Sequence, residues 1–308
     1  MYDVIIIGAG PGGLTAGLYT GRYRMKTLIL EKIAVGGQIT MSAIIENYPG
    51  FPGGISTTEL VQKMEEQTRA AGAEIESAEV IAVESDPADA PYVHTIKTAD
   101  KNFKAKTIII SSGAHWKRLG VPGEEKFVGR GVSFCATCDA PFFRNKEIVV
   151  VGGGDKAVEE AIFLTAYAAK VTIIHRRKEL RAAEILQEKA KANPKINFVL
   201  DSVVEEISGE SKVAAVRVKN VLTNSVVTIP CQGVFVFVGI IPSTDFLKKQ
   251  LAADNAGFII TDDKMKSSID GIFACGDCRS KDLYQVITAC GEAAQAAFAA
   301  HNYLLHVK

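Results

Sequence analysis

The stretch VIIIGAGPGG, at residues 4–13, decides the fold of the N-terminal part of this chain of 308 residues. Its first four residues are β-branched, which is typical of a strand buried on both faces of a parallel sheet. This strand leads into a GxGxxG turn, after which a helix is expected to about Tyr23, and a second strand at residues 27–30 ends at Glu31. The order strand, glycine turn, helix, strand and acid predicts a dinucleotide-binding unit.

The glycines of such a turn have distinct physical functions. One makes the tight turn, one lets the backbone approach a pyrophosphate, and one lets the helix pack closely on the strand. The N-terminus of the helix attracts the phosphate charge, and an acid at the position of Glu31 accepts hydrogen bonds from the ribose. A GxGxxG turn alone is a weak signal, and here the flanking strands and Glu31 strengthen it.

The same plan recurs at residues 148–157, with the sequence IVVVGGGDKA. A helix is expected to follow at residues 158–168 and a strand at residues 171–174. At the position that Glu31 occupies in the first unit stands the basic sequence HRR, residues 175–177. The chain is therefore predicted to contain two nucleotide sites of different charge.

The basic residues after this later strand favour NADPH as the ligand. Arg176 and Arg177 suit the 2′-phosphate of NADPH, which an acid would repel. Charge-assisted hydrogen bonds from two arginines predict a preference for NADPH over NADH on the order of 100-fold or more. The alternative is that Arg176, Arg177, Lys178 and Arg181 form a solvated basic face at the start of the next helix.

Two thiols three positions apart precede the second unit, in the sequence CATCD at residues 135–139. Residues i and i+3 of a helical turn or tight loop bring their Cβ atoms to about 5 to 6 Å, close to the spacing of a disulfide. A CxxC segment also lowers the pKa of one thiol, and Asp139 beside it can supply or accept a proton. The alternative is that Cys135 and Cys138 are half of a zinc site, with Cys275 and Cys278 as the other half. Zinc ribbons separate their two pairs by only about 15 to 20 residues, whereas these two pairs lie much farther apart in the sequence. We predict a redox pair and no metal site.

Composition argues against several other classes of protein. Basic and acidic residues balance at 35 each, so no overall charge points to nucleic acid or an anionic membrane as a partner. No apolar stretch approaches the roughly 20 residues that span a bilayer, and the N-terminus shows no secretion signal. We therefore expect a soluble, cytoplasmic protein whose six cysteines are reduced by default, so that any disulfide is catalytic.

Together these motifs closely resemble those of the low-molecular-weight, bacterial-type thioredoxin reductases, which are class II pyridine nucleotide-disulfide oxidoreductases. The match runs nearly from end to end. The segments that carry it are GAGPGG at 8–13, GGQ at 36–38, ENYPG at 46–50, CATCD at 135–139, GGG at 152–154, HRR at 175–177 with RA at 181–182, and GD at 276–277.

The resemblance implies an α/β fold of two Rossmann-like, three-layer nucleotide-binding domains, as in glutathione-reductase-like proteins. Residues 1–116 and 246–308 would form a discontinuous FAD-binding domain, and residues 117–245 an inserted NADPH-binding domain that carries the CxxC pair. The implied FAD-binding residues are Gly8, Gly10, Pro11, Gly13, Glu31, Gly37, Gln38, Asn47, Asp277 and Gln285. The implied NADPH-binding residues are Gly152, Gly154, Ala157, His175, Arg176, Arg177 and Arg181.

The resemblance also implies the route of the electrons. Hydride would pass from NADPH to FAD, and electrons would then reach the Cys135–Cys138 disulfide and finally the disulfide of thioredoxin or a thioredoxin-like protein. In this scheme Cys138 faces the flavin, Cys135 attacks the partner, and Asp139 is the catalytic acid. A homodimer and a rotation of the two domains are implied as well.

The sequence departs from the family pattern at three places. Tyr284 stands where an arginine is common, and Lys156 stands in the second glycine turn where a small hydroxyl residue is usual. Cys275, Cys278 and Cys290 stand where small or apolar residues are common, and we expect them to be buried, inert thiols. Two other functions remain open: an FAD-dependent dithiol oxidase that acts on a small molecule, and a non-catalytic nucleotide sensor.

Overall fold

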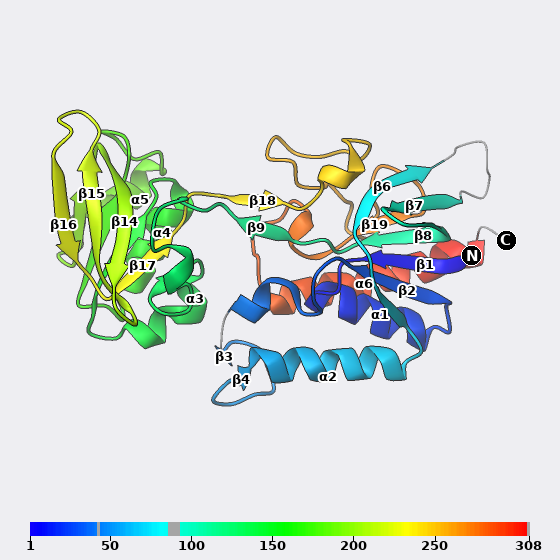
Figure 1. The fold of residues 1–308 in the computed structure, drawn as a ribbon. Helices are drawn as coiled ribbons and strands as arrows, with labels where there is room; N and C mark the ends of the chain where they lie inside the picture. The colour runs from blue at the N-terminus through cyan, green and yellow to red at the C-terminus, as the bar shows by residue number, and fades with distance from the viewer. Residues whose placement is uncertain (42–43, 86–92, 307–308) are drawn as a thin grey trace. The chain divides into compact units, whose positions relative to one another are not determined.

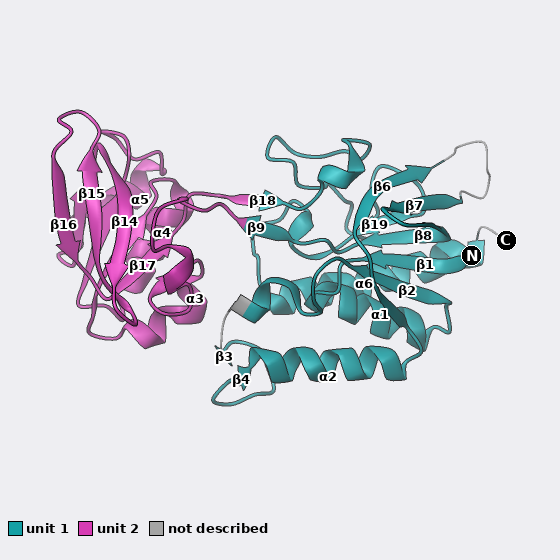
Figure 2. Ribbon diagram, viewed as in Figure 1, with its two compact units in different colours: residues 1–115, 241–308 teal, residues 116–240 magenta. Residues whose placement is uncertain are grey.

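The computed structural model describes residues 1–41, 44–85 and 93–306 (Figure 1). The chain divides into two compact units, of which unit 1 comprises residues 1–115 and 241–308 and unit 2 comprises residues 116–240 (Figure 2). It passes between them along β9 (Ala114–Trp116) and β18 (Ile240–Pro242), which pair with each other.

Unit 1 is built on a seven-stranded sheet. Six of its strands follow the order β5-β2-β1-β8-β7-β6, and the seventh, β19, pairs with β8. Strands β5, β2, β1, β8 and β19 run parallel, whereas β8, β7 and β6 form an antiparallel meander. The elements of unit 1 are β1 (Tyr2–Ile7), α1 (Pro11–Arg22), β2 (Thr27–Glu31), η1 (Gly37–Met41), β3 (Ile44–Ile45), β4 (Ile55–Ser56), α2 (Thr57–Ala70), β5 (Glu74–Ser77), β6 (Val80–Ser85), β7 (His94–Thr98), β8 (Asn102–Ile110), η4 (Asp245–Leu247), β19 (Ile272–Ala274), η5 (Gly276–Cys278) and α6 (Val286–His306).

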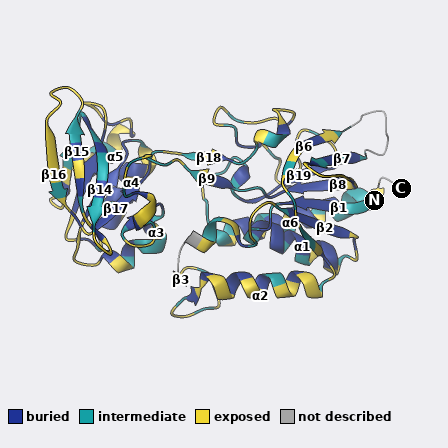
Figure 3. Cartoon of the chain, viewed as in Figure 1, coloured by how far each residue is buried: buried dark blue, intermediate teal, exposed yellow. Residues whose placement is uncertain are grey.

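Strand β1 contains the β-branched run at residues 4–7 and lies between β2 and β8. Val4 and Ile6 belong to a hydrophobic core that includes residues of α1 and α6, whereas Ile5 and Ile7 belong to a second core with residues of β6 and β7. All four side chains are at most 5% exposed. The strand is therefore buried on both faces, as its sequence predicts, and Figure 3 shows the central strands in dark blue.

Unit 2 has a five-stranded parallel sheet with the order β10-β17-β11-β12-β13 and a separate antiparallel sheet with the order β14-β15-β16. Its elements are η2 (Glu125–Phe127), β10 (Val132–Ser133), α3 (Ala136–Asp139), η3 (Ala140–Phe143), β11 (Glu147–Val151), α4 (Asp155–Leu164), β12 (Lys170–Ile174), α5 (Glu184–Ala192), β13 (Ile196–Val199), β14 (Ser202–Gly209), β15 (Val213–Asn220), β16 (Val226–Pro230) and β17 (Gly233–Val236).

The parallel sheet of unit 2 is covered differently on its two faces. Ile148 and Val150 of β11 pack into a core with residues of α4 and α5. Val149 and Val151 pack into a core with residues of β14 and β15. Helices thus cover one face and an antiparallel meander covers the other, which gives the three-layer α/β architecture that the family resemblance implies.

The elements that flank the two glycine turns lie where the sequence predicts them, except for helix α4, which begins at Asp155 rather than at residue 158. Helix α4 ends at Leu164 rather than at Ala168. The Thr165 hydroxyl donates a hydrogen bond to the carbonyl of Ile162 at 2.6 Å, and the chain continues through turns to residue 168. A threonine side chain that bonds to the nearby backbone competes with the helix, which explains the early end. Over the described ranges, no helix combines the length and the apolar character needed to cross a membrane.

Candidate redox and nucleotide sites

Cys135 and Cys138 form a disulfide in unit 2, with their Cα atoms 5.3 Å apart. Cys135 is the N-cap of the short helix α3, which contains Cys138, and both residues are half-buried. Helix α3 packs against α4, the helix that begins at the second glycine turn. The predicted redox pair is therefore in contact with an element of the second nucleotide unit.

Asp139, the next residue, lies in a largely buried position at the end of α3. The Ser133 hydroxyl donates a hydrogen bond of 2.6 Å to its Oδ2 atom. Burial raises the pKa of the Asp139 carboxyl, and the hydrogen bond from Ser133 acts in the opposite direction because it stabilises the ionised form. A carboxyl with a raised pKa beside a disulfide is suited to supplying a proton during thiol chemistry.

The first glycine turn has the geometry that a nucleotide loop requires. Gly8 has a φ of +103°, and a Cβ atom there would collide with the carbonyl of Ser111 at the end of the neighbouring strand. A Cβ atom at Gly13 would collide with the carbonyl of Gly8, so α1 packs tightly on the turn. Gly10 is the N-cap of α1, and the nearest atom to a Cβ there would be a carbonyl oxygen 3.9 Å away. Pro11 begins the helix, and the open side of Gly10 is where a phosphate can approach.

Glu31 lies at the carboxyl end of β2, beside this turn. Its Oε2 atom accepts a hydrogen bond from the backbone N–H of Ala9 at 2.8 Å, and its Oε1 atom accepts one from the N–H of Ile33 at 3.1 Å. The carboxylate is thus fixed against the glycine turn. A ribose hydroxyl is the group that an acid in this place binds in dinucleotide units.

Four further predicted flavin residues come from three separate parts of unit 1. Gly37 begins η1, and a Cβ atom there would lie 3.3 Å from the Cα atom of Gly10. Gln38 follows in the same turn of 3₁₀ helix and is half-buried. The Asn47 amide donates a hydrogen bond of 2.9 Å to Oε1 of Gln285, which directly precedes α6.

Asp277 lies in η5 with one carboxylate oxygen buried. The Lys281 ammonium is 3.2 Å from this Oδ1 atom but outside hydrogen-bonding geometry, so Oδ1 accepts no hydrogen bond from the described residues. Burial raises the pKa of the Asp277 carboxyl, and Lys281 partly opposes that shift. Lys281 also bonds to Glu292 of α6 at 3.4 Å. A buried carboxylate oxygen that is paired with a cation but accepts no hydrogen bond is a position at which a ligand hydroxyl can donate.

The second glycine turn has the same backbone plan. Gly152 has a φ of +152°, and a Cβ atom there would collide with the carbonyl of Phe237 at the end of the adjacent strand. Gly154 is the N-cap of α4 and has open space around it. Ala157 takes the place that Gly13 has in the first turn and is fully buried. The turn therefore also offers an accessible helix N-terminus.

His175 lies at the end of β12 with its ring against Gly153. Its Nε2 atom is buried and has no hydrogen-bond partner within the described ranges. Burial lowers the pKa of His175, and the neighbouring charges of Arg181, Arg176 and Arg177 lower it further. These influences favour a neutral imidazole that can accept or donate one further hydrogen bond.

The three arginines lie in the loop between β12 and α5 and are exposed. The backbone N–H of Arg181 donates to the carbonyl of Gly153 at 2.6 Å, so the basic loop is tied to the glycine turn. Arg176 and Arg177 directly follow His175. This placement fits an anion site beside the turn, whereas the alternative basic face requires the start of a helix, and α5 begins only at Glu184.

The departures from the family pattern have defined surroundings. Lys156 forms an ion pair with Glu160, which is buried in α4. The Tyr284 ring lies 5.7 Å from the ring of Phe258. Cys275, Cys278 and Cys290 are buried free thiols, and burial raises the pKa of each. No cluster of three or more His, Cys, Asp or Glu side chains suited to a metal occurs in residues 1–41, 44–85 and 93–306.

Sequence reasoning did not identify Ser133, Lys281 or Glu292 as parts of these sites. Ser133 is two residues before Cys135, and only the fold brings its hydroxyl to Asp139. Lys281 and Glu292 are mostly buried charged residues that pair at 3.4 Å beside Asp277. An i, i+4 spacing from Asp277 to Lys281 was the available signal for the lysine.

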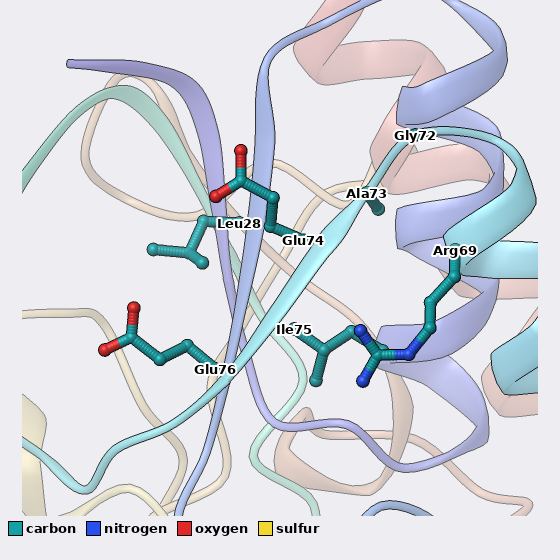
Figure 4. Close-up of a pocket in the computed structure, with 7 residues that line it drawn as sticks. All are labelled: Leu28, Arg69, Gly72, Ala73, Glu74, Ile75 and Glu76. Atoms are coloured by element: carbon teal, nitrogen blue, oxygen red, sulfur yellow. The ribbon is translucent and has the colours of Figure 1, made fainter.

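A shallow depression of about 550 Å³ lies elsewhere on unit 1, along β5 and the end of α2 (Figure 4). It contains none of the predicted site residues, and its walls carry the charged side chains Arg69, Glu74 and Glu76. Charged side chains on an edge strand also prevent pairing with another strand. The depression therefore has no part in the sites described above.

Comparisons with known proteins agree with this arrangement. Residues 2–297 match the family described as pyridine nucleotide-disulphide oxidoreductase. The thioredoxin reductase of Peptoclostridium acidaminophilum is 45% identical over 310 residues, which cover 99% of this chain and 97% of that protein. The thioredoxin reductase of Bacillus subtilis (strain 168) is 43% identical over 305 residues, which cover 99% and 95%.

The fold comparison leads to the same group of proteins. The crystal structure of thioredoxin reductase from Streptococcus pyogenes MGAS5005 superposes with a TM-score of 0.93 at 47% identity, over 99% of this chain and 98% of that one. The family match and the two relatives each extend over nearly the whole chain. The chain therefore belongs to the pyridine nucleotide-disulphide oxidoreductase family.

Proposed function

We propose that this protein is an NADPH-dependent thioredoxin-disulfide reductase. Electrons pass from NADPH to FAD, then to the Cys135–Cys138 disulfide, and finally to oxidised thioredoxin or a thioredoxin-like protein. The observation that carries the proposal is the disulfide itself, which lies beside Asp139 and against the helix of the second glycine turn. The names of relatives that are 43% to 45% identical over nearly the whole chain support the choice of substrate.

The residues of unit 1 fit FAD. The open side of Gly10 would accommodate the pyrophosphate, Glu31 would bind the adenosine ribose, and Oδ1 of Asp277, which accepts no hydrogen bond from the described residues, would accept one from the ribityl chain. The other residues proposed to hold FAD are Gly8, Pro11, Gly13, Gly37, Gln38, Asn47 and Gln285. FAD, when bound, supplies the two-electron relay between the nicotinamide and the disulfide.

The residues of unit 2 fit NADPH. The open side of Gly154 accommodates the pyrophosphate at the N-terminus of α4. Arg176 and Arg177, which are exposed directly after His175, would bind the 2′-phosphate, and the unpartnered Nε2 of His175 would bond to the same ligand. Gly152, Ala157 and Arg181 complete the proposed set. On this assignment unit 1 is the FAD-binding domain and unit 2 the NADPH-binding domain.

The chemistry at the cysteine pair is thiol–disulfide exchange. Reduction of the Cys135–Cys138 bond takes up two electrons and two protons and leaves two thiols. The Cys135 thiolate attacks the partner's disulfide and forms a mixed disulfide, and Cys138 then displaces the partner as a dithiol while the Cys135–Cys138 bond forms again. Asp139 supplies and recovers a proton at this site.

The test is an anaerobic addition of NADPH to the flavin-loaded protein, followed by oxidised thioredoxin, with the flavin absorbance recorded. We expect bleaching after NADPH and recovery after thioredoxin. Recovery that requires oxygen and not thioredoxin would favour the dithiol oxidase, and the absence of bleaching would favour a nucleotide sensor. Either result would overturn the proposal.

The remaining parts of the proposal concern partners and location. We propose a cytoplasmic homodimer that acts without membrane or nucleic acid. The balanced charge of 35 basic and 35 acidic residues supports the absence of a nucleic-acid partner. Size-exclusion chromatography with light scattering checks the dimer, and a mass of one chain would contradict it.

A further inference from the structure

The proposed route of electrons gives no role to Ser133, although its hydroxyl contacts both Asp139 and the backbone of Cys135. Ser133 lies on β10 and is 3% exposed. Its Oγ atom is 2.6 Å from Oδ2 of Asp139. The same Oγ accepts the backbone N–H of Cys135 at 3.2 Å and lies 3.3 Å from the Cys135 carbonyl oxygen. One hydroxyl therefore joins the candidate acid to the backbone of the candidate nucleophile.

This hydroxyl has two complete hydrogen-bonding arrangements, because a hydroxyl donates one proton and accepts on two lone pairs. When Asp139 is ionised, Ser133 donates to Oδ2 and accepts from the N–H of Cys135. When Asp139 is protonated, the carboxyl O–H donates to Ser133, and the Ser133 proton turns to the Cys135 carbonyl. Each arrangement gives every buried donor an acceptor, which a buried polar cluster requires.

We propose that Ser133 is a positioning residue that partners the Asp139 carboxyl in both of its protonation states and so holds it beside the Cys135–Cys138 pair throughout the catalytic cycle. Asp139 gives up one proton when it acts as an acid and regains one from solvent. Ser133 keeps its own proton and only changes the acceptor to which that proton points. What the acid is used for rests on the proposed function, whereas the two arrangements follow from the geometry of unit 2.

The charged groups on neighbouring elements do not take the place of Ser133. Helix α3 packs against α4 and η3, and β10 pairs with β17. Neither η3 nor β17 contains a charged residue. On α4, Asp155 accepts from a backbone N–H, Lys156 and Glu160 pair with each other, and Glu159 is exposed. The two influences on the Asp139 carboxyl are its burial and the Ser133 hydroxyl.

Ser267 in unit 1 is a matched control. Its Oγ accepts a hydrogen bond from the N–H of Ile269 at 3.3 Å and lies 3.3 Å from the Ile269 carbonyl oxygen. Ser133 makes the same two contacts with Cys135, which is also two positions later in the chain. Ser267 is also buried, at 8% exposed. It differs from Ser133 in having no carboxylate partner in the part of the chain that the structure describes.

The test is a pH titration of the oxidised, flavin-loaded protein by difference infrared spectroscopy. The carbonyl band of protonated Asp139 is identified by its loss in Asp139→Asn. Ser133→Ala removes a charge-assisted bond from the ionised form and a weaker neutral bond from the protonated form, so the midpoint should rise by about one pH unit. Ser133→Gly, a second variant without the hydroxyl, should show the same rise. Ser133→Thr retains the hydroxyl and should titrate like the wild type, as should Ser267→Ala.

The pH profile of thioredoxin reduction gives a second measurement. The acidic limb should move in Ser133→Ala in the same direction as the infrared midpoint, and Ser133→Thr should restore it. A wild-type midpoint in both Ser133→Ala and Ser133→Gly would overturn the proposal, as would a shift in Ser267→Ala of the same size. The infrared titration needs no turnover, so its failure is distinct from a failure of the wild-type protein to reduce thioredoxin.

Discussion

The two units each contain a cysteine pair with the same spacing, but the two pairs are in opposite environments. In unit 2, Cys135 and Cys138 are half-buried and joined in a disulfide at the start of a short helix. In unit 1, Cys275 and Cys278 are fully buried thiols. Burial raises the pKa of both thiols in unit 1, and that of Cys278 to about 11. Spacing alone therefore does not make a redox pair, and neither does a nearby aspartate, because Asp277 also lies between Cys275 and Cys278. Exposure to solvent decides whether a thiolate can form and attack.

The largest expected difference in activity is between two variants that each lack one cysteine, one variant for each pair. Cys138→Ser should lower thioredoxin reduction at least about 1,000-fold, because the disulfide that carries the electrons is lost. Cys278→Ala should leave that activity within about threefold and lower the free energy of unfolding by about 1 to 2 kcal/mol through a small cavity. Steady-state assays and urea unfolding measure the two effects. Equal losses of activity in both variants would remove the distinction between the pairs.

Substituting the aspartate beside each cysteine pair should distinguish a residue that acts in the reaction from one that binds the cofactor. Asp139→Asn should slow thioredoxin reduction on the order of 100- to 1,000-fold, since it removes the acid while leaving unit 1 unchanged. Asp277→Asn should act mainly on flavin retention, because its buried Oδ1 is the atom proposed to face FAD. Flavin content after dialysis and turnover at saturating FAD distinguish them. If Asp139→Asn loses flavin and keeps its rate when reloaded, the roles are reversed.

The two glycine turns can be compared through the residues that follow them. Glu31 is fixed by backbone N–H groups in unit 1, whereas Arg176 and Arg177 are exposed beside the second turn. Arg176→Ala combined with Arg177→Ala should reduce the NADPH:NADH ratio of kcat/KM by about 100-fold, because both charges facing the 2′-phosphate are removed. Similar efficiency with the two nucleotides in the wild type would contradict the assignment.

The last expected effect is on stability rather than activity, and it is a pH dependence that belongs to unit 1. His94 is fully buried on β7, and burial lowers its pKa to about 4 from 6.5. The folded protein favours the neutral imidazole of His94, so the protein is most stable above the pKa that His94 has in the unfolded chain. As the pH falls from 6.5 toward 4, the free energy of unfolding should drop by about 1.4 kcal/mol per pH unit, because the unfolded chain binds the proton first.

His94→Gln is the corresponding variant, and urea unfolding between pH 7 and pH 5 is the measurement. We expect a less stable protein at pH 7 whose stability changes less with pH over this interval. His175 of unit 2 is buried against Gly153 of the second glycine turn, so its substitution should alter NADPH affinity instead. A pH slope that His94→Gln leaves unchanged would contradict this account of His94.

Much of the fold could be predicted from the sequence because local signals and tertiary packing agree there. The runs at residues 4–7 and 148–151 form the buried parallel strands β1 and β11, and the glycines after them make the close turns that their spacing predicts. The Cys135–Cys138 disulfide was predicted from the spacing of the two thiols together with Asp139 and the two flanking nucleotide units. In these segments the chemistry of each residue and the geometry of its neighbours point to the same structure.

Other features depend on contacts that no local pattern encodes. The early end of α4 comes from one threonine hydroxyl, and no motif predicts the covering of one face of the unit 2 sheet by β14 and β15. The contact of Asn47 with Gln285 joins residues 238 positions apart. The bond between Ser133 and Asp139 needs β10 and α3 to be folded before it exists. Such contacts are set by packing at long range, which periodicity and motif spacing do not describe.

The central claim is that electrons from NADPH reach the pair in unit 2 and not the pair in unit 1. Alkylation of the native, flavin-loaded protein before and after anaerobic NADPH, followed by peptide mass spectrometry, tests it most directly. We predict that Cys135 and Cys138 are labelled only after NADPH, whereas Cys275 and Cys278 remain unlabelled in both samples. Labelling of Cys275 and Cys278 after NADPH, with the Cys135–Cys138 disulfide still intact, would contradict the account.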